Sequence, residues 1–513
     1  MNAHGSNTQF FWLLLIAFVV GLGARRLRVP YALALVMTGL ALGKARLFPG
    51  LQLEPQLLFT VFLPPLLFES AIHLRLDQLR RNWAPIAIYT LAGTVFSALL
   101  IGVLVSWLLG LPLLSALVFG ALISATDPIS VLAIFKRLGA GRRLTLIMEA
   151  ESLFNDGVAA VLFAVLLAAS LGGALSFSGG MLSFLQLIVG GTVLGAFIGA
   201  CAIAMHQNLD DHLVELMLST LVAFGSFLAA ESLHVSGVMA VVAAGLVLGN
   251  FGQDALTPGV RLALSAFWEY AGFVVNSLIF LLIGIQVVAL DWSDKVALAL
   301  GAALLVLLGR SVIYPLSWLV NRVGGQVPRS WQHVLVWGGL RGALSMALVL
   351  GLPRDFAGRE TLVAATFGVV LFSLLVQGLT VGPLLSRLGL TGEAARGPQA
   401  EGRLRSELAA TNAALAYLDE LRRSEAYPRW VIETLAHDYN RRLALLESSL
   451  DSPSRDGLDE EKQSAEVRVL VLSAEKKSYQ DAERHGLLDE EEWRRIAARI
   501  DAELFALKVK QGG

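Results

Sequence analysis

Long apolar runs separated by short polar loops occupy the first 390 residues of the chain. A helix that spans a membrane needs about 20 mostly apolar residues. The pattern therefore predicts an all-α polytopic membrane protein with thirteen transmembrane helices. The runs lie near residues 8–24, 29–43, 55–72, 83–109, 113–137, 144–171, 180–205, 212–232, 236–251, 267–290, 296–320, 330–352 and 361–388.

The last 123 residues follow a different pattern. They contain 24 acidic and 19 basic residues, a far higher density of charge than in the apolar part. Leucines recur among these charges at helical spacing, at Leu404, Leu408, Leu415, Leu418 and Leu421. We therefore expect two domains, a transmembrane domain at 1–390 and a charged helical cytoplasmic domain at 391–513. No motif in this tail indicates its ligand.

Composition excludes several classes of protein. The chain is 55% hydrophobic and 16% charged, with a mean hydropathy of +0.65, whereas soluble proteins are about 25% charged. A net charge of −1 argues against a nucleic-acid partner. The single cysteine, Cys201, excludes an internal disulfide and a cysteine-based metal site. We expect a lipid bilayer around the helices, and no motif requires a cofactor.

The distribution of basic residues predicts the topology. Lys and Arg mark cytoplasmic loops, and thirteen of them fall in the odd-numbered predicted loops against five in the even-numbered ones. This bias places the N-terminus outside and the charged tail in the cytoplasm. We expect a multi-pass protein of the cytoplasmic (inner) membrane.

Five charged residues lie deep inside the predicted helices. Each costs about 2.5–3.5 kcal/mol on insertion scales, so such residues are retained when they pair or perform a function. The membrane domain is therefore expected to have a polar interior, formed around Asp127, Glu151, Asp156, Arg310 and Arg341.

Two of the predicted helices carry residues that interrupt a helix. Pro128 follows Asp127 in the fifth run, and proline removes a backbone donor and clashes with a carbonyl four residues earlier. Thr126 supplies a hydroxyl and a carbonyl at this break. In the twelfth run three glycines at 338, 339 and 342 surround Arg341 and weaken the helix. Two interrupted helices in separate halves suggest a transporter built from inverted repeats.

The sixth run offers oxygen ligands for a small cation. Ser152 and Asp156 are four residues apart and share one helical face, with Asn155 beside it. Hydroxyl, amide and carboxylate oxygens suit Na⁺ or Li⁺ better than soft metals. Such a carboxylate can hold a cation or a proton in turn. We therefore expect cation or proton binding at Asp156, with Ser152 and Asn155 as further ligands.

The other acids in this region have different expected roles. Glu151 lies about 140° around the helix from Asp156 and is expected to pair with a base on another helix. Arg310 and Arg341 are the candidate partners, and each stays protonated, which suits a counter-charge. Glu69 follows a Pro-Pro pair and is either a helix-end acid or a side ligand near the ion path.

These residues are compatible with more than one function. The same scaffold could exchange K⁺ for protons, because oxygen ligands do not fix the choice of cation. A membrane-embedded hydrolase is disfavoured, since neither an HExxH nor a GxSxG motif occurs in context. A channel or a sensor that signals through the tail is a third class.

Taken together, five motifs resemble the monovalent cation:proton antiporter family, which includes the sodium/proton antiporters of bacteria and archaea and the sodium/proton exchangers of animals. The resemblance runs in order over about residues 60–390. It rests on PPLLFES (64–70), ATDP (125–128), ESLFND (151–156), GR (309–310) and GGLRG (338–342).

This resemblance implies a non-enzymatic exchange of Na⁺ (or Li⁺) for H⁺ by alternating access, in a homodimer with thirteen helices and crossed broken helices. Asp156 would carry the ion or proton, assisted by Ser152, Thr126 and Glu69. The Asn155-Asp156 pair resembles that of the electroneutral members. Glu151 would pair with an arginine, Arg310 in preference to Arg341, and Asp127 with Pro128 would support the helix crossing.

Overall fold

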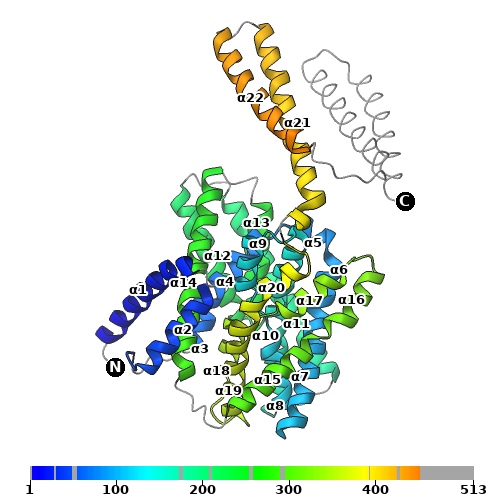
Figure 1. Ribbon diagram of the computed structural model, residues 1–513. Helices are drawn as coiled ribbons and strands as arrows, with labels where there is room; N and C mark the ends of the chain where they lie inside the picture. The colour runs from blue at the N-terminus through cyan, green and yellow to red at the C-terminus, as the bar shows by residue number, and fades with distance from the viewer. Residues whose placement is uncertain are drawn as a thin grey trace. The chain divides into compact units, whose positions relative to one another are not determined.

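The computed structural model describes residues 3–27, 31–48, 55–172, 177–206, 211–252, 258–288, 295–391, 393–424 and 428–450. Within these ranges all regular secondary structure is helical (Figure 1). The chain divides into two compact units, residues 1–397 and 398–513. The functions of the two units as membrane and cytoplasmic domains stay predictions.

The described residues up to 391 form twenty helices and three π-helical turns, and these turns lie at Leu58–Phe62, Ile88–Gly93 and Ser373–Gln377. The helices are α1 (Ala3–Leu27), α2 (Tyr31–Lys44), α3 (Pro55–Leu57), α4 (Leu63–His73), α5 (Leu76–Arg81), α6 (Trp83–Ala87), α7 (Thr94–Leu109), α8 (Leu113–Ser124), α9 (Ile129–Leu138), α10 (Arg142–Ser170), α11 (Phe177–His206), α12 (His212–Ser232), α13 (Gly237–Phe251), α14 (Pro258–Val288), α15 (Val296–Arg310), α16 (Ile313–Arg322), α17 (Arg329–Trp337), α18 (Ala343–Leu350), α19 (Arg359–Phe372) and α20 (Gly378–Arg387).

Among the described residues, nine helical segments are long and apolar enough to cross a membrane. Three shorter apolar helices lie at 11–24, 31–44 and 237–251, and the interrupted pair α17–α18 covers the remaining predicted run. Every predicted run therefore coincides with helix, while thirteen crossings stay a prediction. One boundary was wrong, because α14 begins at Pro258 and not near 267. Its first turns carry the polar residue Arg261, which an apolar criterion assigns to a loop.

The tail is helical where the structure describes it. Helix α21 (Glu393–Ser424) covers the leucine pattern at 404–421, and a further helix, α22 (Arg429–Leu450), follows it. Thr411 of α21 and Ile432 of α22 are buried. Residues 451–513 of the predicted helical domain lie outside the described residues.

Helix α10 occupies the middle of the first unit. It packs against helices that come both before and after it in the chain, including α4, α7, α8, α11, α13 and α18. A helix surrounded in this way can shelter polar side chains from lipid, which explains how several charged groups persist along it.

Both predicted helix interruptions are confirmed. Helix α8 ends at Ser124 and α9 begins at Ile129, and α17 ends at Trp337 before α18 begins at Ala343. The two interruptions meet, since the N–H of Asp127 donates to the carbonyl of Leu340 at 2.8 Å. Backbone groups freed from helical bonding therefore find partners inside the protein, as a membrane interior requires.

Candidate ion-binding site

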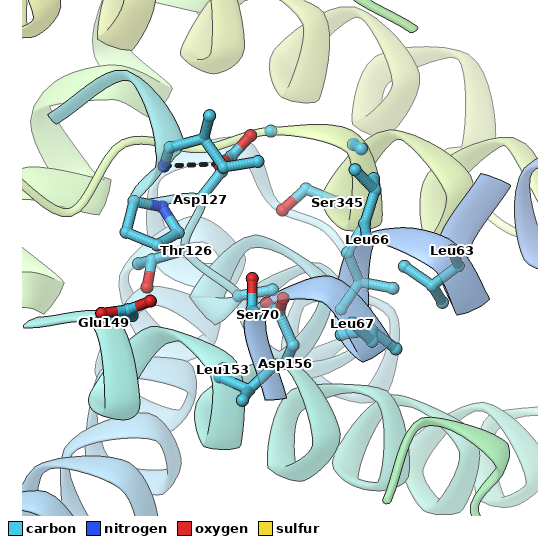
Figure 2. Close-up of a pocket in the computed structure, with 16 residues that line it drawn as sticks. Leu63, Leu66, Leu67, Ser70, Thr126, Asp127, Glu149, Leu153, Asp156 and Ser345 are labelled. Carbon is cyan, nitrogen blue, oxygen red and sulfur yellow. Dashed lines mark hydrogen bonds between the residues drawn. The ribbon is translucent and has the colours of Figure 1, made fainter. Parts of the chain in front are cut away.

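A cavity of about 50 Å³ lies where α4, α10 and the two interruptions come together (Figure 2). Leucines and other apolar residues form much of its wall. A single water occupies about 30 Å³ of liquid, so the space fits a small cation or a water molecule. Its polar lining consists of Ser70, Thr126, Asp127, Glu149, Asp156 and Ser345.

Asp156 presents an unsatisfied carboxylate oxygen at this cavity. Its Oδ1 is buried and has no hydrogen-bond partner among the residues that the structure describes. Buried polar atoms normally have partners, so a bare carboxylate oxygen beside a cavity indicates a group that receives something from outside the chain. A proton or a small cation would satisfy it.

Thr126 ties the first interruption to α10. Its Oγ1 lies 2.6 Å from the Ser152 Oγ, and that hydroxyl lies 2.7 Å from the Thr126 carbonyl oxygen. Asn155 donates from Nδ2 to the Thr126 Oγ1 at 2.7 Å and accepts from the Thr126 N–H at 3.2 Å. Ser152 and Asn155 therefore fix the position of Thr126. They do not themselves line the cavity, and their expected role as cation ligands stays a prediction.

Glu151 and Arg310 form a buried, bidentate ion pair. Arg310 donates from Nη1 to Oε1 at 2.9 Å and from Nη2 to Oε2 at 2.8 Å. Asn155 adds a third donor to Oε1 at 2.9 Å. Gly339 allows this approach, because a Cβ there would lie 2.7 Å from the Arg310 Nε. Neither residue of the pair lines the cavity, and Asn155 connects the pair to the lining residue Thr126.

Asp127 and Arg341 stabilise the ends of the interrupted helices. Asp127 accepts from the Ile129 N–H at 3.0 Å, at the positive N-terminus of α9. Arg341 donates from Nη1 to the carbonyls of Ser124 and Ala125, at 2.6 and 2.9 Å, at the negative C-terminus of α8. Arg341 was expected as an ion-pair or counter-charge residue. Its guanidinium hydrogen-bonds backbone carbonyls and lies close enough to Glu151 and Asp156 to interact electrostatically with both, and its role as a counter-charge stays a prediction.

Glu69 lies beside the cavity without lining it. Its carboxylate is 3.9 Å from the His73 Nδ1 and accepts a long hydrogen bond, 3.4 Å, from the Ser70 hydroxyl. Ser70 is the residue of this turn that reaches the cavity wall. The role of Glu69 as a side ligand near the ion path stays a prediction.

Three polar cavity residues were missed by the sequence reasoning: Ser70, Glu149 and Ser345. Glu149 carried a usable signal, because it lies seven residues before Asp156 and two helical turns bring both to one face. Ser345 donates to the Leu122 carbonyl at 2.8 Å. That contact joins α18 to α8. It could not be predicted from a local sequence pattern, because the two residues are far apart in the chain.

Comparison with known proteins agrees with this architecture. Residues 14–387 match the family described as "Sodium/hydrogen exchanger, transmembrane". The chain is 40% identical over 404 residues to the Na⁺/H⁺ antiporter NhaG of Bacillus atrophaeus, covering 76% of each protein. It is 42% identical over 395 residues to the Na⁺/H⁺ antiporter ApNhaP of Aphanothece halophytica, covering 76% of this chain and 74% of that one.

The fold also resembles a solved structure, that of the sodium proton antiporter MjNhaP1 from Methanocaldococcus jannaschii. The TM-score is 0.62 at 21% identity, over 76% of this chain and 99% of that one. The family match spans most of the chain, and it includes both interruptions and all of α10. The chain belongs to the sodium/hydrogen exchanger family.

Proposed function

We propose that the protein exchanges Na⁺, or Li⁺, for H⁺ across a membrane, and that Asp156 binds the cation and the proton in competition. The observation that carries this proposal is the unpartnered Oδ1 of Asp156 at the cavity. The activities in the names of the relatives, both Na⁺/H⁺ antiporters, support the choice of substrates.

Competition for one carboxylate provides the coupling. An empty, charged Asp156 is costly to move through a dry barrier, whereas a carboxylate neutralised by Na⁺ or H⁺ is not. Only the occupied protein then changes its access between the two sides. Inward movement of one ion therefore requires outward movement of the other.

The balance of buried charges favours one-for-one exchange. Glu151 is neutralised by Arg310, and Asp127 and Arg341 contribute opposite charges at the helix crossing. Of the five charged residues deep in the predicted helices, Asp156 is the acid that is left after these two pairs of opposite charge. One monovalent cation or one proton neutralises it, so exchange at this group is electroneutral.

The cation is bound by oxygen atoms around Asp156. Thr126 shares the cavity wall and presents the backbone of a broken helix. Ser152 and Asn155 contact Thr126 directly, and Ser152 joins the coordination of Na⁺ by exchanging its hydrogen bond with Thr126 for a bond to the cation. Glu69 lies one residue from the lining residue Ser70 and adds negative charge on the side of α4.

The protein acts in the cytoplasmic membrane, with the N-terminus outside and residues 391–513 forming a cytoplasmic domain. The excess of basic residues in the odd-numbered loops supports this orientation. It works as a homodimer, as the family resemblance implies. The ligand of the cytoplasmic domain is not specified by any residue pattern.

The test is cation flux in sealed proteoliposomes under an imposed pH gradient, with Na⁺, Li⁺ and K⁺ compared. Na⁺ and Li⁺ should move protons and saturate, and Asp156→Asn should abolish exchange while leaving a folded protein. Undiminished exchange in that variant contradicts the role of Asp156. Exchange of K⁺ in preference to Na⁺ contradicts the substrate, and non-saturating flux would indicate a channel.

A further inference from the structure

A third carboxylate, that of Glu149, lines the same cavity as Asp127 and Asp156. Both residues lie on α10, and seven residues of helix separate them by about 10.5 Å along its axis. Seven residues also complete almost two full turns, so both side chains project from one face. Figure 2 shows Glu149 and Asp156 on the α10 side of the cavity.

The Glu149 carboxylate is unengaged, in contrast to its neighbour on the helix. No hydrogen bond or salt bridge joins it to another residue in the described part of the chain. Glu151, two residues later, is held by Arg310 and Asn155. Glu149 thus keeps its oxygens available to a ligand that comes from outside the protein.

A line of charged groups connects Glu149 with the surface. Glu149 lies close enough to Glu69 and His73 to interact electrostatically with both, and Glu69 interacts in turn with Glu269 of α14. The side chains of Glu69 and His73 are 28% and 39% exposed. His73 also hydrogen-bonds Ser265 of α14 at 2.8 Å. The acids therefore run from the exposed Glu269, through the partly buried Glu69, to Glu149 at the cavity wall.

We propose that Glu149 forms an outer station for the cation, at which Na⁺ is held with part of its hydration shell on its way between Glu69 and Asp156. The inference rests on the proposed function of Asp156. A row of acids of one sign in a low-dielectric setting raises the local cation concentration. Glu149 therefore sets the apparent affinity for Na⁺, while the exchange step itself depends on Asp156.

The experiment is a Na⁺ titration of the exchange rate in proteoliposomes for the wild type, Glu149→Gln and Glu149→Asp. Loss of the charge should raise the KM for Na⁺ about threefold to tenfold, the effect of one partly screened charge at this separation, with kcat changed less than about twofold. Glu149→Asp keeps the charge and should stay closer to the wild type. Glu231→Gln, which removes a carboxylate outside the cavity, is the matched control and should leave KM unchanged.

Ionic strength separates this role from a structural one. Raising it with an impermeant organic cation should weaken Na⁺ affinity in the wild type, and this dependence should be smaller in Glu149→Gln. An unchanged KM with an unchanged salt dependence overturns the proposal. So does a fall in kcat at constant KM in both Glu149 variants, which would indicate a packing defect.

The same data separate failure of this inference from failure of the proposed function. If Asp156→Asn retains exchange, the proposed function fails whatever Glu149 does. If Asp156→Asn is inactive and Glu149→Gln titrates like the wild type, only the outer station is excluded.

Discussion

The Arg310 guanidinium donates two parallel hydrogen bonds, of 2.9 and 2.8 Å, to the Glu151 carboxylate, although 159 residues separate the two in the chain. Their side chains are 7% and 1% exposed. The ion pair joins the C-terminal end of α15 to α10. It also leaves no net charge at that place in the membrane interior.

We expect this pair to act on stability more than on ion binding. Glu151→Ala and Arg310→Leu should each destabilise the protein by about 3–5 kcal/mol, because each leaves the other charge buried without its partner. The double variant should lose less than the sum of the two. Thermal unfolding and the monodisperse yield in detergent measure these effects.

Arg310→Lys is the informative control for this prediction. A single ammonium cannot reproduce two parallel bonds to one carboxylate, so lysine should restore only part of the stability. A Glu151→Ala protein that is as stable as the wild type and loses only Na⁺ affinity would show that Glu151 belongs to the ion site.

Gly342→Ala should disrupt the crossing of the interrupted helices. A Cβ at this position would collide with the Asp127 side chain, and overpacking of this kind costs about 1–3 kcal/mol. Gly301→Ala on α15 is the matched control, because nothing lies within 4 Å of its Cβ position. We expect a lower melting temperature and slower exchange in the first variant and neither change in the second.

Asn155→Asp should damage the site. Asn155 donates to both the Thr126 hydroxyl and the Glu151 carboxylate, and an aspartate would replace these donors with a second negative charge. Leaving such buried groups unsatisfied costs about 1–3 kcal/mol. We expect reduced stability and reduced exchange. If the variant is stable and its exchange becomes voltage-dependent, Asn155 instead controls the number of protons exchanged per cation.

The competition at Asp156 predicts a linked dependence on pH and Na⁺. A proton on the carboxylate excludes the cation, so the apparent KM for Na⁺ should rise as pH falls. The maximal rate at saturating Na⁺ should change less. Initial rates over a grid of pH and Na⁺ concentrations measure both effects, and a KM that is independent of pH would argue for separate proton and cation sites.

Local signals predicted the helices and their interruptions well. The interruptions were predictable because their causes are contained in a few adjacent residues, Pro128 in one case and the glycines around Arg341 in the other. Long apolar runs similarly located each helix. The start of α14 was missed because Arg261 interrupts its otherwise apolar first turns and was assigned to a loop.

The orientation of side chains around the cavity was much less predictable. Ser152 and Asp156 share a helical face by spacing. The Ser152 hydroxyl nevertheless hydrogen-bonds Thr126, which belongs to another segment. The partner of Arg341 is the end of α8, 217 residues earlier for the bond to Ser124. Such contacts depend on tertiary packing, which the periodicity of a single helix does not contain.

The contacts between the two interruptions have a consequence for biosynthesis. In the folded protein the Ser124 and Ala125 carbonyls are satisfied by Arg341, and the Asp127 N–H by Leu340. Both partners leave the ribosome more than 200 residues after the groups that they satisfy. The first broken helix is therefore inserted with these backbone groups unpaired. They gain their partners only after the twelfth predicted segment has been synthesised and inserted. A nascent chain truncated before residue 338 should remain a target for chaperones and membrane proteases.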